Sequence, residues 1–134
     1  MHTFLLVFLG AAGAAWCQSA TTPQPAAPRP LTLPLECQTG DCPLLRGAPQ
    51  TAGMRSGFVR LKPGQTVGWH TTGQNEESLV IFRGRGEVLI EGQPKLDLTG
   101  PGFAYIPAGR RHNVANTGDQ PLEYVYVVAP AGTR

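Results

Sequence analysis

Two histidines and one glutamate have the residue types and spacing that could do chemistry in this chain. His70 precedes Glu77 by seven residues, and His112 follows in a second polar stretch at residues 110–116. Neutral imidazoles and a carboxylate bind first-row divalent metals such as Fe, Mn, Ni, Cu and Zn. The sequence therefore holds the ligands of a small metal site, provided that the fold brings the three side chains together.

The segments that must position these residues have the pattern of short strands. From residue 54 onward, apolar runs alternate with Gly and Pro turn signals, and no window of eleven residues shows a clean helical period. Seven or more short strands at this spacing predict an all-β fold, either a sandwich or a barrel. The expected strands cover residues 58–61, 78–82, 87–90, 96–98, 103–106, 112–116 and 122–128.

Alternation along a strand tells which side chains share a face. Glu77 has the parity of Leu79, whereas Glu76 has the parity of Val80. Both sets are apolar beyond the two acids, so parity alone leaves open which glutamate points into the core.

Composition limits the class of protein and of partner. The chain has 134 residues, of which 41% are hydrophobic and 15% charged, enough for the core of one domain. It carries 11 Lys and Arg against 9 Asp and Glu, with no large basic cluster, which argues against nucleic acid or an anionic membrane as partner. A neutral or mildly anionic small molecule is the expected ligand.

The first residues have the pattern of an export signal. An apolar run followed by small residues predicts a signal peptide over residues 1–19, too short for a membrane-spanning helix. The cleavage position stays open among Cys17, Ser19 and Ala20. Trp16 stands where a lipoprotein needs a small residue, which argues against a lipid anchor at Cys17. We expect a periplasmic or secreted protein.

A linker and a cysteine pair follow the signal. Residues 20–36 are rich in Pro, Ala and Thr and predict an extended linker, which puts the folded domain at residues 37–134. Once the leader is removed, Cys37 and Cys42 form an even pair in a short loop, which predicts a structural disulfide in an oxidising compartment. Four intervening residues and no second pair argue against a zinc site.

The surroundings of the first histidine follow a known spacing. Gly64 is followed after five residues by His70, and Glu77 is followed after six residues by Gly84. This pattern resembles the first motif of the cupin superfamily, small jelly-roll β-barrels that hold one metal ion inside the barrel. The motif has a second histidine where this chain has Thr72.

The second cupin motif has its counterpart in the sequence IPAGRRHNVAN. Pro101 replaces its leading glycine, and the matching positions are Pro107, Gly109, His112 and Asn116. The resemblance covers residues 54–128 and implies a single cupin β-barrel. Apart from His2 in the leader, His70 and His112 are the only histidines, and both fall on motif positions.

The resemblance implies one divalent transition metal and its ligands. Cupins usually supply three histidines and one glutamate, and the matching residues here are His70, Glu77 and His112. Thr72 leaves three alternatives open. A site of two histidines and one carboxylate survives, or Gln74 or Glu76 replaces the missing ligand, or the metal is absent and the three residues line a polar pocket.

Two functions follow from the resemblance. The first is a metal-dependent dioxygenase, isomerase or lyase acting on a small oxygen-rich substrate. The alternative is a non-catalytic module that binds a sugar or small metabolite in the same pocket, with or without metal. The sequence offers no separate general base with a clear position, so catalytic residues stay unassigned. Family members commonly form dimers, which the resemblance implies here as well.

Overall fold

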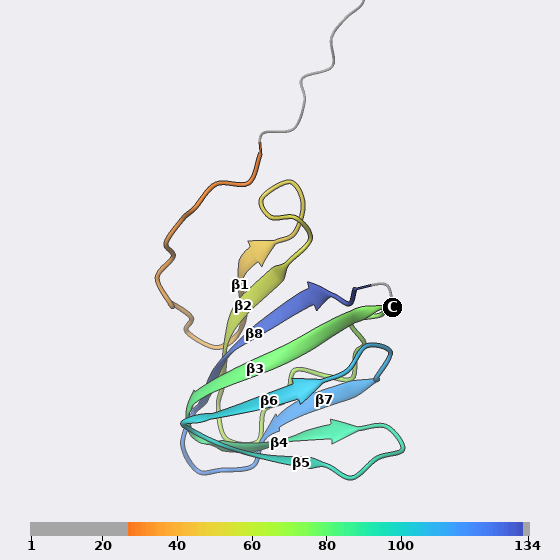
Figure 1. Cartoon of the computed structure of the whole chain (residues 1–134). Coiled ribbons are helices and arrows are strands. Elements are labelled where there is room, and N and C mark those ends of the chain that lie inside the picture. The colour runs from red at the N-terminus through yellow and green to blue at the C-terminus, as the bar shows by residue number, and fades with distance from the viewer. Residues whose placement is uncertain (1–26, 133–134) are drawn as a thin grey trace, which may run out of the picture.

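The computed structural model describes residues 27–132, which form an all-β fold of two antiparallel sheets (Figure 1). One sheet has five strands in the order β1-β2-β8-β3-β6, and the other has three in the order β5-β4-β7. The strands are β1 (Gly40–Arg46), β2 (Arg55–Leu61), β3 (Asn75–Arg83), β4 (Arg85–Ile90), β5 (Leu96–Thr99), β6 (Gly102–Ile106), β7 (His112–Asn116) and β8 (Leu122–Pro130). The all-β prediction is confirmed.

The seven strands expected from the sequence all lie within observed strands, but β1 was not expected. Residues 40–46 contain Pro43, which cannot donate a backbone hydrogen bond to a ladder. β1 tolerates it because it is an edge strand, paired only with β2, and because its register shifts between Pro43 and Leu45. Because of the proline and the cysteines, the sequence pattern of β1 did not indicate a strand.

Side chains from both sheets form one hydrophobic core, and this core settles the parity of β3. Glu77 and Leu79 are buried, with 5% and 0% of their surface exposed, whereas Val80 is 38% exposed on the outer face. The inward set therefore carries Glu77. The core consists of Val59, Leu61, Leu79, Ile81, Val88, Ile90, Leu98, Ala104, Ile106, Val114, Leu122 and Tyr124.

The first described residues of the chain lead into the disulfide. The expected signal peptide, residues 1–19, and residues 20–26 of the linker lie outside the described residues. Residues 27–36 form neither helix nor strand and are exposed. They lead to the bond between Cys37 and Cys42, so the predicted disulfide is present. In the part of the chain that the structure describes, no helix could cross a membrane.

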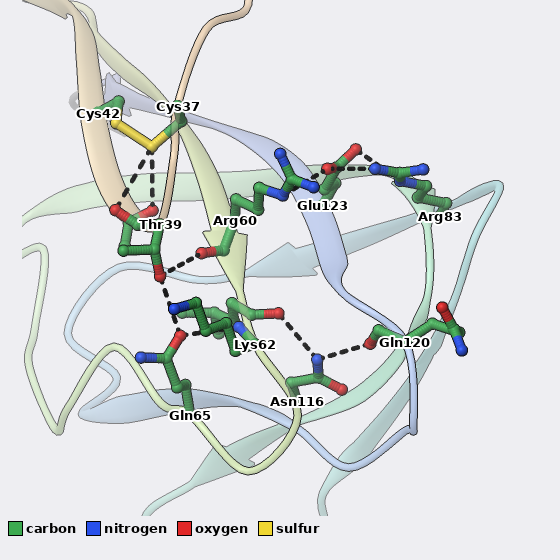
Figure 2. Close-up of polar contacts among 12 residues, drawn as sticks. Cys37, Thr39, Cys42, Arg60, Lys62, Gln65, Arg83, Asn116, Gln120 and Glu123 are labelled. Carbon is green, nitrogen blue, oxygen red and sulfur yellow. Dashed lines mark hydrogen bonds and ion pairs between the residues drawn. A yellow bond between two sulfur atoms is a disulfide. The ribbon is translucent and has the colours of Figure 1, made fainter.

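Polar side chains fasten the end of the fold where β3 and β7 finish and β8 begins (Figure 2). Glu123 on β8 is 3.1 Å from Nε of Arg60 and accepts hydrogen bonds of 2.7 and 2.8 Å from Arg83. Asn116 donates to the carbonyl oxygens of Leu61 and Gln120 at 2.9 and 2.8 Å. These contacts tie the ends of β2, β3 and β7 to one another and to the start of β8.

Candidate metal centre

The backbone brings the two histidines together at the other end of β7. His70 lies outside the named strands but forms an isolated bridge with His112. Each backbone N–H donates to the carbonyl of the other residue at 2.9 Å. The two imidazole rings consequently lie side by side, with centroids 4.4 Å apart and planes inclined by 61°.

Glu77 completes the cluster from the inner face of β3. Its Oε2 lies 3.1 Å from Nε2 of His112, which has no exposed surface. One ligand atom from each of His70, Glu77 and His112 falls within 4.8 Å of the others. The structure thus unites all three residues that the sequence selected, in a geometry that could hold a metal ion.

Hydrogen bonds to the backbone set the orientation of both rings. Nδ1 of His70 lies 2.9 Å from the carbonyl oxygen of Gly68, and Nδ1 of His112 lies 2.9 Å from that of Arg110. A carbonyl oxygen only accepts, so each Nδ1 carries a proton and each neutral ring presents the Nε2 lone pair. Metal-binding histidines are commonly held in this way, so the donor set fits a divalent transition metal.

The His112–Glu77 contact shows how the charge of the buried Glu77 carboxylate is compensated when no metal is bound. Burial lowers the pKa of His112, but the hydrogen bonds to Glu77 and to the Arg110 carbonyl outweigh it and raise the pKa above its ordinary value of 6.5. The imidazolium pairs with a carboxylate that is costly to bury alone. A metal ion would take the place of that proton.

Thr72 has a structural role at the motif position where a histidine is usual. It is 8% exposed, and its hydroxyl donates to the carbonyl oxygen of Asn75 at 2.8 Å. The Asn75 side chain donates back to the Thr72 carbonyl at 2.8 Å. The threonine therefore fixes the turn that delivers Glu77 to the start of β3.

The two proposed replacements for the missing histidine do not reach the site. Glu76 points to the outer face, where its carboxylate accepts a 2.7 Å hydrogen bond from the Tyr105 hydroxyl. Gln74 is exposed, and neither residue lines the cavity beside the histidines. Of the alternatives raised by Thr72, the structure disfavours a substitute ligand from this loop.

A cavity of about 180 Å³ opens beside the cluster, lined by His70, Glu77 and Thr72. Its wall also contains Asp41 from β1 and Tyr126 from β8, along with Arg55 and Tyr124. Sequence reasoning missed Asp41 and Arg55, because neither belongs to a motif. Tyr124 and Tyr126 could be placed in this wall only from the sheet order, which pairs β8 with both β2 and β3.

Comparison with known families agrees with this fold. Residues 57–128 match the family described as "Cupin domain". The chain belongs to the cupin family. Among curated relatives, it is 34% identical over 89 residues to "Protein SchB" of Streptomyces halstedii and 32% identical over 89 residues to "Polyketide synthase CurC" of Streptomyces cyaneus. Each match covers 64% of this cupin, 64% of SchB and 57% of CurC, so less than two thirds of either relative is spanned.

Solved structures show the same fold. The protein BH2720 of Bacillus halodurans has a TM-score of 0.66 and 22% identity, covering 80% of this chain and 86% of that one. The Cnp3 cupin domain of Schizosaccharomyces pombe has a TM-score of 0.62 and 20% identity, covering 75% and 70%. At these identities the likeness establishes the jelly-roll β fold alone.

Proposed function

We propose that this cupin is exported, binds one divalent transition metal through His70, Glu77 and His112, and uses the ion to act on a small oxygen-rich compound. The carrying observation is that two imidazoles, each held by its Nδ1, and one carboxylate oxygen converge within 4.8 Å beside a cavity. Three protein ligands leave positions on an ion for water or substrate. Bound there, the metal would act as a Lewis acid or bind oxygen.

The cavity favours a small ligand. Its volume is about 180 Å³. It is smaller than the roughly 300–1,000 Å³ of pockets that enclose drug-sized ligands. CurC of Streptomyces cyaneus is named a polyketide synthase, and TcmJ of Streptomyces glaucescens is named a tetracenomycin polyketide synthase protein, which favours an oxygen-rich carbonyl compound here. The cavity is too small to enclose a multi-ring product, so we propose a single-ring or short-chain compound.

The cysteine bond supports the proposal of export. A disulfide between Cys37 and Cys42 persists in an oxidising compartment and is rare in the cytosol. Expression of the full chain with the compartments separated tests this point. Cleavage of the leader and recovery outside the cytoplasm are expected, and an uncleaved chain in the cytoplasm would contradict export.

Metal analysis tests the proposed site. We expect about one bound ion per wild-type chain after dialysis against Fe(II), Mn(II) or Zn(II). His70→Ala, His112→Ala and Glu77→Gln each remove a ligand, so their affinity should fall at least about a hundredfold, the upper end of what loss of a supporting contact alone causes. Glu76→Gln is the matched control, since that acid faces Tyr105, and it should retain the ion.

Two results would contradict the metal site. The first is a wild-type chain that holds no more metal than the His70→Ala variant, and the second is a Glu76→Gln variant that loses the ion. With metal bound, oxygen uptake and product analysis over diketones, thiols and phenols tests for a dioxygenase, isomerase or lyase. Ligand-dependent melting shifts without turnover would instead favour the non-catalytic binding module.

A further inference from the structure

Asp41 brings a second carboxylate to the cavity that holds the histidine cluster. It lies on β1, is exposed, and lines the same cavity as His70 and Glu77. Among residues 27–132, its carboxylate accepts one hydrogen bond, from the Tyr126 hydroxyl to Oδ2 at 3.3 Å. Its Oδ1 has no donor within the described chain and can accept a hydrogen bond from a bound molecule.

Tyr126 donates its hydroxyl proton to this carboxylate over 3.3 Å. Burial, together with the Asp41 charge, raises the pKa of Tyr126 to about 12, so the phenol stays protonated at neutral pH and donates. Burial also raises the pKa of Asp41, while Tyr126 and His70 oppose that rise. Asp41 as a whole residue is exposed, but its carboxylate packs over Gly57 beside Tyr126 and has lost part of its hydration, which a ligand hydroxyl can replace.

Gly57 on β2 leaves the room that this pair needs. A Cβ at Gly57 would lie 2.6 Å from both Cε1 and Oη of Tyr126 and 2.7 Å from Oδ1 of Asp41. Gly57 is in register with Tyr126 on the neighbouring strand. A glycine inside a strand weakens it and often marks a close approach by another group. Three strands therefore contribute to one polar feature of the cavity wall.

The charges of the cavity define what such a feature would bind. His70 and Glu77 lie within electrostatic reach of Asp41, the first stabilising its charge and the second opposing it. The Asp41 carboxylate would repel an anionic group, which could pair instead with Arg55 in the same cavity wall, whereas a hydroxyl can donate to Oδ1. At the histidine cluster, by contrast, a ligand oxygen would bind as an electron-pair donor to the metal.

We infer that Asp41 and Tyr126, placed over Gly57, form a hydroxyl-binding subsite, so that the ligand carries a metal-binding oxygen at one end and a hydroxyl donor at the other. This inference rests on the proposed function, from which it takes the metal end of the ligand. It assigns a specificity role to Asp41 and identifies the ligand class as small hydroxylated acids or carbonyl compounds.

Paired probes test the subsite. Short ω-hydroxycarboxylates of two to five carbons are titrated against the metal-loaded protein, each beside the carboxylate that lacks the hydroxyl. In at least one pair the hydroxylated probe should bind about tenfold more tightly, equivalent to about 1.4 kcal/mol. Asp41→Ala should abolish this preference without changing the metal content. Tyr126→Phe should reduce it, and Asp119→Asn, an exposed acid beside the Arg83 end, should leave it intact.

The readouts separate this inference from the proposed function. The same pairs are titrated against metal-free protein by NMR, where affinities should fall but the preference for the hydroxyl should persist. A metal-loaded wild type that binds both members of every pair equally would overturn the subsite, as would an Asp41→Ala variant that keeps the preference. A wild type that takes up no metal on dialysis but still prefers the hydroxylated probes would overturn only the metal proposal.

Discussion

His112 and Asn116 lie at opposite ends of β7, and both are buried, with 0% and 2% of their surface exposed. Asn116 uses both donors on backbone carbonyls, and its Oδ1 accepts from the Gly118 N–H at 2.9 Å. His112 uses only Nδ1 on the backbone and turns Nε2 toward Glu77. Asn116 therefore stabilises the fold, because backbone groups satisfy all of its hydrogen-bonding atoms. His112 differs, because its Nε2 faces the titratable Glu77 and stays available to bind a metal ion.

Glu77 and Glu123, a buried and a half-buried glutamate, show the same contrast. Glu123 pairs with Arg60 and Arg83, whose guanidinium groups stay charged at any physiological pH (Figure 2). Glu77 pairs with His112, which can give up its proton. The charge at the Glu123 end is therefore fixed, and the charge at the Glu77 end can be exchanged for that of a metal ion.

The largest expected effect comes from substituting the two ends of β7 separately. His112→Ala should lower metal affinity at least about a hundredfold, equivalent to about 2.7 kcal/mol, because it removes a ligand. Asn116→Ala should leave metal content unchanged but lower the free energy of unfolding by about 2 kcal/mol, because buried carbonyls lose their donors. Metal titration and denaturant unfolding measure both. If the Asn116 variant lost the metal while its fold stayed intact, the proposed division between a metal ligand at His112 and a structural residue at Asn116 would be wrong.

Gly57→Ala should have the next largest effect. The added Cβ would overlap Tyr126 and Asp41 at 2.6–2.7 Å, and relief of that contact must displace side chains or backbone. Overpacking of this kind costs typically about 1–3 kcal/mol. Denaturant unfolding should show this loss, while metal content stays near that of the wild type. A variant as stable as the wild type would show that the cavity wall adapts freely.

A smaller effect should appear in the pH dependence of the metal-free protein. The pKa of His112 is higher in the folded state than its ordinary value of 6.5, so its protonation stabilises the fold at pH below 6.5. This stabilisation should be lost as pH rises through the folded-state pKa. Unfolding followed from pH 6 to 9 should show the decline in wild type and in Asn116→Ala but not in His112→Ala. An equal decline in all three would assign it to other groups.

The smallest effect is expected for Arg83→Ala. The Arg83 side chain is 60% exposed, and exposed ion pairs contribute little to stability. Glu123 also keeps its contact with Arg60 in this variant. The melting temperature and metal content should both stay within error of the wild type. A large loss of stability would mean that Arg83 holds the end of the fold alone.

The sequence predicted the cluster because its spacing is local and its residue types are rare. His70 and Glu77 belong to one motif, and His112 to another, so a family resemblance could select all three. Parity left the choice between Glu76 and Glu77 open, because both had apolar neighbours on their faces. Only the pairing of β3 with β6 and β8 decides it, and that pairing is a long-range property.

Asp41 could not be found in the same way. Its partner Tyr126 is 85 residues away, and the two meet only because β1, β2 and β8 are adjacent in one sheet. Pro43 and the cysteines gave residues 37–46 the pattern of a disulfide loop, so β1 was not predicted. The role of Gly57 could not be predicted from the sequence either, since it depends on the close approach of Tyr126 and Asp41 in the folded structure.

We propose that both imidazoles present Nε2 to one ion because Nδ1 of each is held by a backbone carbonyl. Nitrogen-15 NMR of the histidine rings, recorded on the chain before and after addition of Zn(II), tests it most directly. His70 and His112 should both keep a proton on Nδ1, and both Nε2 resonances should shift with one equivalent of zinc. Nε2 resonances that stay unchanged under saturating zinc, or rings that carry their proton on Nε2 in the zinc-loaded state, would contradict it.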